Sequence, residues 1–548
     1  MPLLRIARAT RPLARTFARG LATAADAVIE RDVVVVGGGP IGLSVVAALG
    51  ASQPTRQSLS VALVEAGDLS KVADWSMPDD AFSNRVVTIT NVSRAFLTDI
   101  GAWSHVREGR VNPVEEIQAW DGLTDSRITF NGPQDVWGPA PLSSVIEVLN
   151  IQQALLNTIR NAQVDVLDKT KVQTITKDTD GEDAWPLVHL SDGRVLRARL
   201  LIGADGFNSP VRSFAHIGAY GWDYDRRGIV ATLQHVPRES SLFSAPNTTA
   251  YQRFLPTGPI AFLPINATRS SMVWSVPTTL ATTLQSLEPQ ALAHMVNAAF
   301  RLPDVSLRYL YSRLPISAGE LLEELRWREH SHSIPAHSAL SASAAADATA
   351  SIGVPPENAQ SLPPLVLDMQ PGTVAPFPLR FQHVDEYVRN RIALVGDAAH
   401  TMNPLAGQGM NIGLADAAEL AKTIENAVLT GSDIGAVTAL QPYARARYLP
   451  NHLMLSGVDK LHKLYATTFP PVVAARSAGL EVVNELDGLK DLIMGAAGSN
   501  DGAAGSSRAN SGAWGHAARA VEVASGAAGF ASLMGQAAIS KVAGMLRR

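Results

Sequence analysis

The sequence predicts an α/β fold in which buried parallel strands alternate with helices. Two observations carry this prediction: short continuous apolar runs, such as the valines of 32–37, and glycine-rich turns that lead from each run into a helical pattern. Continuous apolar runs are typical of parallel strands, because helices cover both faces of a parallel sheet. The same pattern returns at 200–212 and 391–413, so one sheet is expected to be assembled from distant segments.

The first of these turns has the spacing of a dinucleotide-binding loop. Gly37, Gly39 and Gly42 form G-x-G-x-x-G between the apolar strand and the helical pattern that follows. The glycines allow a tight turn and the close approach of a pyrophosphate, to which the helix N-terminus offers unpaired N–H groups. A second apolar strand ends at Glu65, whose carboxylate can accept both ribose hydroxyls of an adenosine. That carboxylate would repel a 2′-phosphate, which leaves FAD or NAD rather than NADP.

Two later turns favour FAD over NAD. The turn after the second apolar run carries Asp205 and Gly206. The third run is followed by Asp397, Pro404 and a glycine-rich entry into a helix. Asp397 can accept a hydrogen bond from a polyol hydroxyl such as those of ribityl. Backbone N–H groups around 407–411, at a helix N-terminus, can stabilise the negative charge of a reduced flavin.

Taken together, the motifs resemble a known family. G-x-G-x-x-G, A-D-G and G-D-A-A-H-x-x-x-P-x-x-G-Q-G-x-N occur in this order between about 32 and 430. In that order they resemble the single-domain FAD-dependent aromatic hydroxylases related to p-hydroxybenzoate hydroxylase. Five connecting segments are similar to the mitochondrial ubiquinone (coenzyme Q) biosynthesis branch of that family: 82–103, 145–155, 251–265, 386–400 and 461–497. The resemblance implies a Rossmann-like FAD-binding fold with an interwoven mixed β-sheet as substrate domain.

The resemblance also implies which residues approach FAD. Arg85 is expected near the pyrophosphate or the ribityl chain, and Glu147 and Asn150 in a segment packed along the cofactor. A surface salt bridge is the alternative for Arg85, and plain helix-face positions are the alternative for the other two. The complete expected set is Gly37, Gly39, Gly42, Glu65, Arg85, Glu147, Asn150, Asp205, Gly206, Asp397, Pro404, Gly407, Gln408, Gly409 and Asn411.

No side chain is predicted as a catalytic residue, because in such enzymes the flavin carries the chemistry. His400 is of a type that suggests acid–base work, but within its motif a structural role is expected. Arg253 and Phe254 are weak substrate candidates, in two strands joined by a Pro/Gly turn, and packing is the alternative for both. No metal is predicted, since the histidines show no ligand spacing such as H-E-x-x-H.

Reaction and partners follow only from the resemblance. It implies transfer of oxygen from a flavin C4a-hydroperoxide to the ring of a polyprenylated phenol or benzoate, such as 4-hydroxy-3-polyprenylbenzoate or 2-methoxy-6-polyprenylphenol. Electrons would come from ferredoxin and ferredoxin reductase, and other coenzyme Q biosynthesis proteins would be partners on the matrix side of the inner membrane. Two alternatives stay open: an NAD(P)H-dependent aromatic hydroxylase of another metabolite, and a flavin-binding scaffold of a biosynthetic complex.

Composition excludes several other classes of protein. The 548 residues contain no cysteine, so disulfides, zinc–thiolate sites and iron–sulfur clusters held by the chain are excluded. A formal net charge of −4 provides no basic field for nucleic acid. The chain contains no run of 18 apolar residues, so no membrane-spanning helix is predicted. It is the resemblance that implies a peripheral membrane protein.

The ends and one insertion differ in composition from the rest. The segment 1–25 contains five arginines and no acid, which is typical of a mitochondrial transit peptide, and its removal would change the net charge from −4 to −9. We expect a hydroxylase unit at 30–497, with FAD-binding segments at about 30–220 and 376–430. Its other parts would be a substrate sheet at about 221–375, a mobile insertion at 337–360 and C-terminal helices at 431–497. A linker at 498–512 and a tail at 513–548 with a helical pattern would follow.

Overall fold

The computed structural model describes residues 28–486 and 490, except 125, 133, 136–137, 161, 182, 238–246, 333–361 and 405–406. The expected transit peptide, the insertion, the linker and the tail all lie outside the described residues. The expected C-terminal helices are described as far as 486.

A mainly parallel sheet forms the first half of the molecule, as the apolar runs predicted. Its strand order is β10-β2-β1-β13-β12-β11, with β21 pairing beside β13 and β20 beside β21. The parallel strands are β1 (Val28–Val36), β2 (Val61–Val64), β10 (Val164–Leu167), β13 (Val195–Gly203) and β21 (Ile392–Leu394). The antiparallel additions are β11 (Val172–Lys177), β12 (Pro186–Leu190) and β20 (Val388–Arg389).

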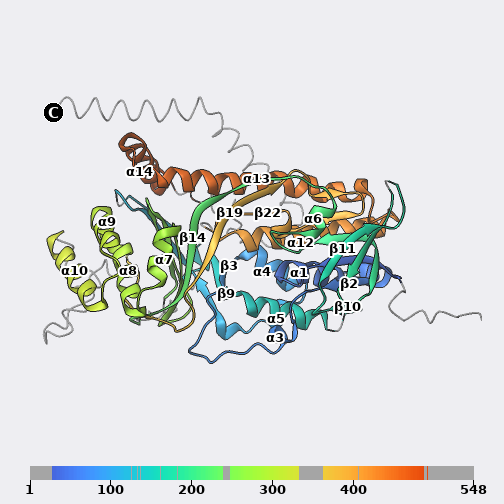
Figure 1. The fold of residues 1–548 in the computed structure, drawn as a ribbon, viewed down its shortest axis with the longest axis horizontal. Coiled ribbons are helices and arrows are strands. Elements are labelled where there is room, and N and C mark those ends of the chain that lie inside the picture. Colours follow the sequence, from blue (N-terminus) through green and yellow to red (C-terminus); the bar gives the residue numbers. More distant parts are fainter. Residues whose placement is uncertain are drawn as a thin grey trace, which may run out of the picture.

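Helices from both ends of the chain cover this sheet. The helix α1 (Pro40–Ala51) contacts α5 (Val148–Ile159) and α12 (Gly409–Leu429), and α12 contacts the long α13 (Val437–Ala466). Figure 1 shows α1 and α12 side by side although they come from distant parts of the sequence. The strands and helices bury one continuous apolar core, as expected of an interwoven α/β unit.

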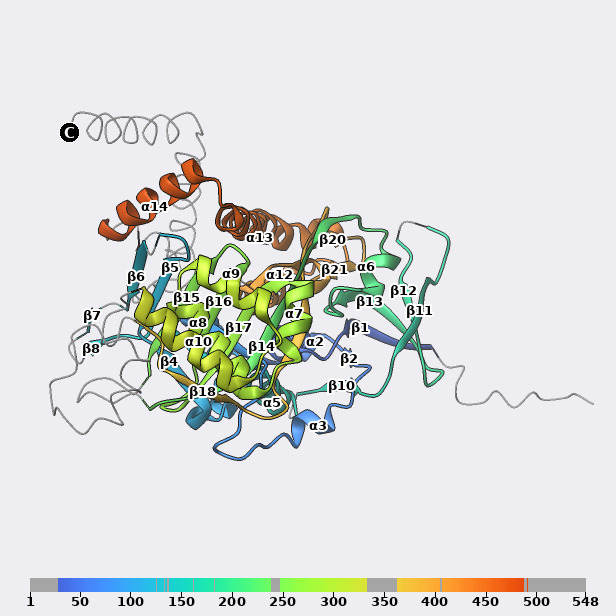
Figure 2. The same cartoon turned by 60° about the vertical axis from the view of Figure 1, so that its left-hand side comes forward.

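The second half is a nine-stranded mixed sheet, with the order β22-β19-β14-β17-β16-β15-β5-β6 and β18 paired with β14. Four helices, α7 (Thr278–Gln285), α8 (Pro289–Arg301), α9 (Asp304–Arg313) and α10 (Ala318–Ser331), cover one face of it (Figure 2). Its strands are β5 (Glu116–Asp121), β6 (Arg127–Asn131), β14 (Ala219–His235), β15 (Thr249–Leu255), β16 (Gly258–Pro264), β17 (Arg269–Pro277), β18 (Val366–Met369), β19 (Ala375–Val384) and β22 (His400–Thr401).

The expected boundaries of the substrate sheet need one correction. β5 pairs in parallel with β15, with Glu116 opposite Thr249, so residues 116–131 belong to the second sheet and not to the FAD-binding range of 30–220. Parallel pairing between strands so distant in sequence leaves no local signal, because no turn connects them.

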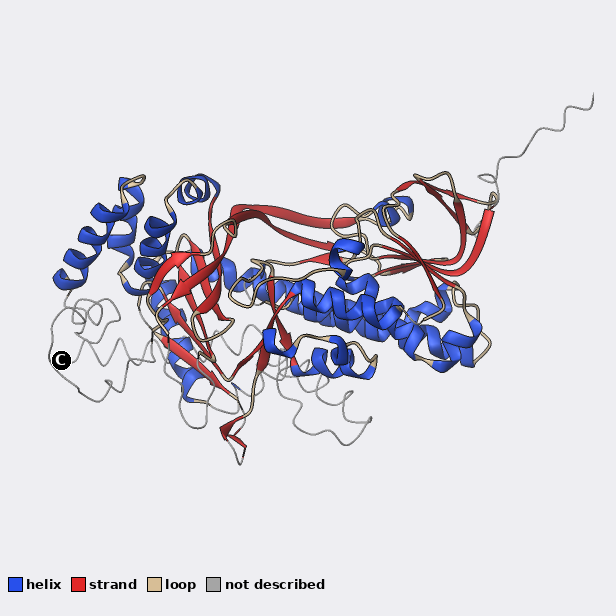
Figure 3. Ribbon diagram, turned by 90° about the horizontal axis from the view of Figure 1, so that it is seen from below, coloured by secondary structure: helices blue, strands red, loops and turns tan. Residues whose placement is uncertain are grey.

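Two long strands connect the halves. β14 and β19 pair antiparallel along most of their length and run from the second sheet to the first (Figure 3). Their register shifts between Asp223 and Arg227, where Asp225 has a φ of 49°. This bulge bends the pair, so that one strand can serve both halves.

Smaller elements fill the junction between the halves. A three-stranded sheet has the order β3-β9-β4, formed by β3 (Val86–Thr90), β9 (Ser143–Glu147) and β4 (Val111–Val114). The remaining short elements are α2 (Gln53–Ser58), α3 (Ser70–Ala73), α4 (Asn91–Asp99), α6 (Pro210–Phe214), β7 (Gln134–Asp135), β8 (Gly138–Pro139), and the 3-10 helices at 103–105, 108–110 and 396–398.

A buried ion pair attaches the last described helix, α14 (Pro470–Glu485), to the second sheet. Arg476 donates from Nε to Asp121 Oδ2 at 2.6 Å and from Nη2 to Oδ1 at 3.0 Å. Its Nη1 donates to the carbonyls of Leu464 and Thr467 at the end of α13. Among the described residues, no helix is long and apolar enough to cross a bilayer.

Candidate cofactor site

The loops that carry the three sequence motifs and Glu65 leave the parallel sheet from one row of paired residues. Val36 lies opposite Val64 on one side and Gly203 on the other, and Gly203 lies opposite Leu394. The loops that leave this row carry the G-x-G-x-x-G glycines, Glu65, the A-D-G turn and Asp397. Ligands of open α/β sheets bind outside the carboxyl ends of the strands, and these four loops meet there.

The first two motifs are in direct contact. Gly37 has a φ of +111°, and a Cβ at this position would lie 2.2 Å from the carbonyl oxygen of Ala204. A Cβ on Gly42 would lie 1.9 Å from the carbonyl oxygen of Gly37. Neither position accepts a side chain, because the opposing atoms are backbone. The spacing of these glycines is therefore required for helix α1 to pack closely against its own loop.

The N-terminus of α1 faces open space. Its N-cap, Gly39, makes no side-chain cap and the first turn contains no acid, so the first N–H groups of the helix have no intrahelical partner. A Cβ on Gly39 would meet no atom within 4 Å. The helix dipole and the free N–H groups make this space suitable for a pyrophosphate.

Glu65 is held at the end of β2 by two backbone amides. Gly38 N donates to Oε2 and Gly67 N donates to Oε1, each at 2.5 Å. Each carboxylate oxygen keeps further lone-pair sites that can accept from hydroxyls. A half-buried carboxylate fixed in this way suits the adenosine ribose.

Gln152, which the sequence did not single out, holds the same glycine loop. Its Nε2 donates to the carbonyl oxygen of Gly38 at 2.8 Å. It lies on α5, far from the loop in sequence, and no local pattern indicates this contact.

Asp397 lies at the other end of the row, in the short 3-10 helix that follows β21. Its side chain is solvent-exposed, yet the surrounding protein raises the pKa of the carboxyl by desolvation, an effect that His400 partly opposes. Within the described residues, no protein group donates a hydrogen bond to this carboxylate, so it is available to the hydroxyls of a ligand.

The N-terminus of α12 lies beside the small sheet. Asn411 accepts from Thr90 N at 3.1 Å and donates to the carbonyl oxygen of Thr88 at 2.9 Å, so its side chain ties the helix to β3. Gly407 has a φ of +62° and donates to the carbonyl of Pro404 at 2.8 Å. Gln408, the N-cap, makes no side-chain cap, and the first helical turn, which begins at Gly409, has no acid. The first N–H groups of this turn therefore have no capping side chain, and their role toward a flavin stays a prediction.

Of the three residues expected in the segments before the A-D-G turn, only Arg85 has a free side chain. Arg85 is exposed, and its guanidinium makes no hydrogen bond or ion pair with any described residue. Glu147 is buried and accepts from Arg110 Nε at 2.6 Å and from Ser83 N at 2.6 Å. Asn150 is buried and exchanges two hydrogen bonds with the backbone of Arg107.

Glu147 and Asn150 thus shape the chain around Arg85. The Arg110 guanidinium that pairs with Glu147 also donates to the carbonyl oxygens of Pro78 and Ala81. The pair therefore fixes the loop that leads into β3.

The A-D-G turn is also locked internally. Asp205 accepts from Val211 N at 3.1 Å, and Ser209 caps the same short helix by accepting from Arg212 N. Arg212 donates to the carbonyl oxygen of Ala398 at 2.9 Å, which joins the second motif to the third. Burial raises the pKa of Asp205, although Ser209 and Val211 lower it. Gly206 has a φ of +82° and open space beside it.

A buried polar cluster lies behind Asp397, with Asp416 at its centre. His400 and Arg447 donate to Asp416 from Nε2 at 2.5 Å and from Nε at 2.9 Å. Asn451 Nδ2 donates to it at 2.9 Å and Gly396 N at 3.3 Å. The structure thus gives His400 a structural partner, as expected, and reveals three residues on α12 and α13 that the sequence did not indicate.

The two weak substrate candidates lie on opposite faces of β15. Arg253 is buried on the helix-covered face, and its Nη1 donates to the carbonyl oxygens of Ala299 and Leu302 at the end of α8. This contact favours the packing alternative for Arg253. Phe254 points to the other face, where its ring stacks on Tyr465 of α13 with ring centroids 4.2 Å apart.

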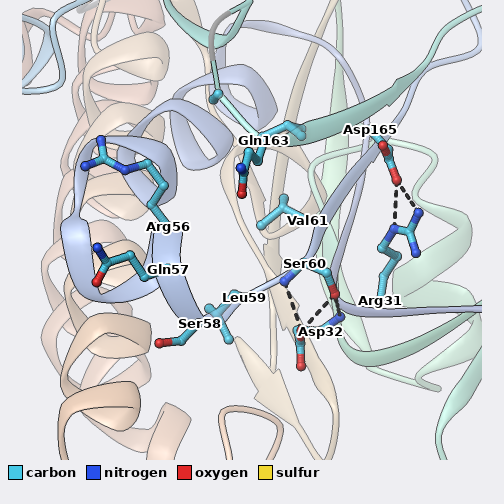
Figure 4. A pocket seen from close by; sticks show the side chains of 12 residues that line it. Arg31, Asp32, Arg56, Gln57, Ser58, Leu59, Ser60, Val61, Gln163 and Asp165 are labelled. Atoms are coloured by element: carbon cyan, nitrogen blue, oxygen red, sulfur yellow. Dashed lines mark hydrogen bonds and ion pairs between the residues drawn. The ribbon is translucent and has the colours of Figure 1, made fainter.

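A pocket of about 590 Å³ lies at the opposite edge of the parallel sheet (Figure 4). Its lining includes Arg31, Arg56, Gln163 and Asp165, and Arg31 pairs with Asp165. Ser60 and Gln163 directly precede β2 and β10, and Arg31 lies in the first half of β1, so the pocket is toward the amino ends of the strands and away from the motif loops.

Asp397 provides a direct test of this site. We expect Asp397→Ala to weaken FAD binding by about tenfold to a hundredfold, the loss of one hydrogen bond to a charged group. The stability of the cofactor-free protein should not change, because this carboxylate makes no hydrogen bond within the described protein. Fluorescence titration with FAD and thermal unfolding measure the two quantities. Asp99→Ala, at an exposed position of α4, is the matched control, and equal FAD affinity in the two variants would exclude Asp397 from the site.

The fold and the site define an FAD-binding flavoprotein. The chain matches the FAD binding domain family over residues 30–308 and 359–448. It is 38% identical over 479 residues to the mitochondrial ubiquinone biosynthesis monooxygenase COQ6 of Schizosaccharomyces pombe, a match that covers 86% of this chain and 93% of that relative. The Homo sapiens protein of the same name is 34% identical over 470 residues, covering 84% and 91%. The chain belongs to this family of mitochondrial ubiquinone biosynthesis monooxygenases.

Solved structures support the fold independently. The p-nitrophenol 4-monooxygenase PnpA of Pseudomonas putida superposes with a TM-score of 0.55 at 17% identity, over 86% of this chain and 98% of that one. PqsL of Pseudomonas aeruginosa, a probable FAD-dependent monooxygenase, superposes with a TM-score of 0.53 at 20% identity, over 84% and 100%. The predicted p-hydroxybenzoate hydroxylase-like fold class and the FAD cofactor are confirmed.

Proposed function

We propose that this protein hydroxylates the ring of a polyprenylated phenol or benzoate during ubiquinone biosynthesis. The observation that supports the proposal is that the loops expected to bind the two ends of FAD leave one row of strand ends, Val64, Val36, Gly203 and Leu394. The adenosine end alone would be compatible with many nucleotide-binding proteins. The family names add the pathway, since the relatives are ubiquinone biosynthesis monooxygenases.

The roles of the chain's own residues follow from their positions. The amides at the N-terminus of α1 and the free guanidinium of Arg85 would bind the pyrophosphate. Glu65 would accept from the ribose, and Asp397 from the ribityl chain. When bound, FAD supplies the activation of oxygen, and the protein orients the cofactor and excludes water.

The N-terminus of α12 would interact with the reactive end of the cofactor. Its uncapped N–H groups, at Gly409 and the residues that follow, offer a fixed positive potential where a reduced flavin carries negative charge. Asn411 holds that helix end on β3, so the amides need not reorganise during the reaction.

One face of the second sheet is suited to bind an apolar substrate. Across five strands, a half-buried row runs through Gln252, Ala261, Val273, Val230 and Ala375, which lie directly opposite one another. This face is opposite to α7–α10. It approaches the small sheet beside the cofactor loops, where Leu263 packs with Val86 and Val145. Four of the five residues in the row are apolar, which suits a phenol with an isoprenoid chain.

Ferredoxin, reduced by ferredoxin reductase, is the proposed electron donor. With no cysteine in the chain, electrons from an iron–sulfur cluster must come from a separate protein. In stopped-flow experiments we expect NADPH alone to leave the FAD absorbance nearly unchanged for minutes. Adding ferredoxin and its reductase should bleach the absorbance within seconds. Rapid bleaching by NADPH alone, in the presence of a soluble phenol, would instead support an NAD(P)H-dependent hydroxylase.

We further propose a location on the matrix side of the inner membrane, in contact with other coenzyme Q biosynthesis proteins. The mitochondrial names of the relatives and the basic, acid-free segment 1–25 support the compartment. A lipid-like substrate supports contact with a membrane.

Mass spectrometry of quinone intermediates tests the proposed reaction. In a deletion strain we expect a polyprenylated intermediate that lacks one ring hydroxyl to accumulate, and the wild-type gene to remove it. A gene encoding Asp397→Ala should fail to do so. Continued quinone synthesis by this variant, with FAD lost and partner proteins still bound, would indicate a scaffold and not an enzyme.

A further inference from the structure

Helix α13 carries a stripe of exposed leucines. The helix lies along the outer edge of the molecule, next to α14 (Figures 1 and 2). At 100° per residue the four leucines fall within an arc of about 120°, largely opposite to the buried residues of the helix, such as Leu455 and Val458. The exposed fractions are 55% for Leu449, 37% for Leu453, 42% for Leu461 and 37% for Leu464.

The charge of this helix departs from that of the chain. The whole chain is net negative, but the 30 residues of α13 contain four basic residues and a single acid. That acid, Asp459, is buried and binds Tyr224 and Lys463 at 2.8 and 2.7 Å. Arg445 and Lys460 are exposed beside the leucines, and neither forms an ion pair with any described residue. The stripe is therefore both apolar and cationic.

An aromatic side chain borders the stripe. Trp222 is exposed, stacks on Phe381 with centroids 4.4 Å apart, and lies 4.5 Å from Lys463 Nζ. Beside it a hollow of about 380 Å³ is lined by Tyr220 and Phe207 among others. Phe207 directly follows the A-D-G turn, so a segment next to a cofactor loop contributes to the wall of this hollow.

We propose that the α13 surface, defined as Arg445, Leu449, Leu453, Lys460, Leu461 and Leu464, docks on a membrane that contains anionic phospholipids. From Leu449 to Leu464 it extends about 22 Å along an outer helix. Leucines entering the boundary between headgroups and acyl chains, with basic side chains on lipid phosphates, are the features of a helix that lies in the interface.

The inference deepens the proposed function and rests on it in one respect. A substrate with a long isoprenoid chain is held in a bilayer, so an enzyme that acts on it needs a membrane-facing surface close to its active site. The hollow is lined both by Trp222, at the border of this surface, and by Phe207, next to a cofactor loop.

Vesicle flotation of the full-length, FAD-bound protein tests the proposal. The two probes are vesicles of phosphatidylcholine alone and vesicles with about a fifth phosphatidylglycerol. We expect the protein to float with the anionic vesicles, and the double variant Leu453→Asp, Leu464→Asp to lower this partition by more than about tenfold. Arg445→Glu with Lys460→Glu should lower it by about fivefold for each basic residue removed, because of the lost attraction to anionic lipid.

The helix α12 provides a matched control. Leu429 and Lys422 are exposed on it, and Leu429→Asp with Lys422→Glu should float like the wild type. All variants share the arginine-rich segment 1–25, so the contribution of that segment to vesicle binding cancels in the comparison.

The outcomes separate this inference from the proposed function. Wild-type flotation by the α13 variants would overturn the docking surface. So would variants that keep vesicle binding but lose a co-purifying protein, since the surface would then be a protein interface. Loss of flotation with an unchanged FAD spectrum would support it. A wild type that floats through α13 but hydroxylates no polyprenylated phenol would refute the proposed function and leave the docking surface in place.

Discussion

The variant Gly42→Ala is expected to lose both FAD and stability. Its new methyl group would lie 1.9 Å from the carbonyl oxygen of Gly37, and neither backbone segment can rotate away. Helix α1 must then move off its loop, at a cost of about 1–3 kcal/mol in the free energy of unfolding. The displaced amides would lose hydrogen bonds to the pyrophosphate, each about 1.5–3 kcal/mol, which is roughly tenfold to a hundredfold in affinity. Urea unfolding and FAD titration measure the two effects.

Gly39→Ala is the matched comparison. Gly39 has a φ of −69° and a ψ of 173°, which alanine adopts freely, and a Cβ there would contact nothing within 4 Å. Stability should fall by no more than about 1 kcal/mol, the preference of an N-cap for glycine over alanine. FAD affinity should still fall, because the methyl group occupies the space where a pyrophosphate would lie. Full affinity in this variant would place the pyrophosphate elsewhere.

The cofactor loops could be predicted because their signals are local. In each motif an apolar run ends in glycine or aspartate, and the run and its turn are adjacent in sequence. The parallel register then brings the ends together, since Val36, Val64, Gly203 and Leu394 share one row. Local pattern and sheet topology together were sufficient to predict that these loops lie together.

The supporting contacts could not be predicted because their partners are distant and follow no period. Glu147 lies 37 residues from Arg110, and Asn150 lies 43 from Arg107. A buried carboxylate in a cofactor-binding segment has the same sequence signature whether it meets a ligand or an arginine. The pairing of β5 with β15 was not predicted for the same reason. A parallel pair between distant strands has no connecting turn that could be recognised in the sequence.

Among these long-range contacts, we expect those of Asp416 to have the largest effect on the free energy of unfolding. It is fully buried and joins three elements: β22 through His400, α12 on which it lies, and α13 through Arg447 and Asn451. It also accepts from Gly396 N, next to Asp397. Without the carboxylate, the largely buried charge of Arg447 has no counter-charge at this position, and the loop of Asp397 loses a hydrogen-bond acceptor that holds it.

We therefore expect Asp416→Ala to lower the free energy of unfolding by about 3–5 kcal/mol at neutral pH, the cost of breaking a buried ion pair on one side. Asp416→Asn keeps the shape and one hydrogen-bond acceptor, and should fall between the alanine variant and the wild type. FAD affinity should fall in both, because the Asp397 loop is less ordered. Glu419→Ala, on the same helix and half-buried, is the control and should change stability by less than about 1 kcal/mol.

The pH dependence distinguishes this ion pair from simple packing. Burial alone would raise the pKa of Asp416, but the positive charges of His400 and Arg447 and the hydrogen bonds lower it to about 2, from an ordinary value of 3.8. A lowered pKa in the folded state means that the ionised group stabilises the fold above about pH 4 and that this contribution is lost as the pH falls toward 2. The difference in unfolding free energy between wild type and Asp416→Ala should therefore narrow across that interval. If this difference in unfolding free energy stays constant from pH 7 to pH 3, the destabilisation of Asp416→Ala comes from lost packing. In that case the ion pair does not hold the loop of Asp397 in place.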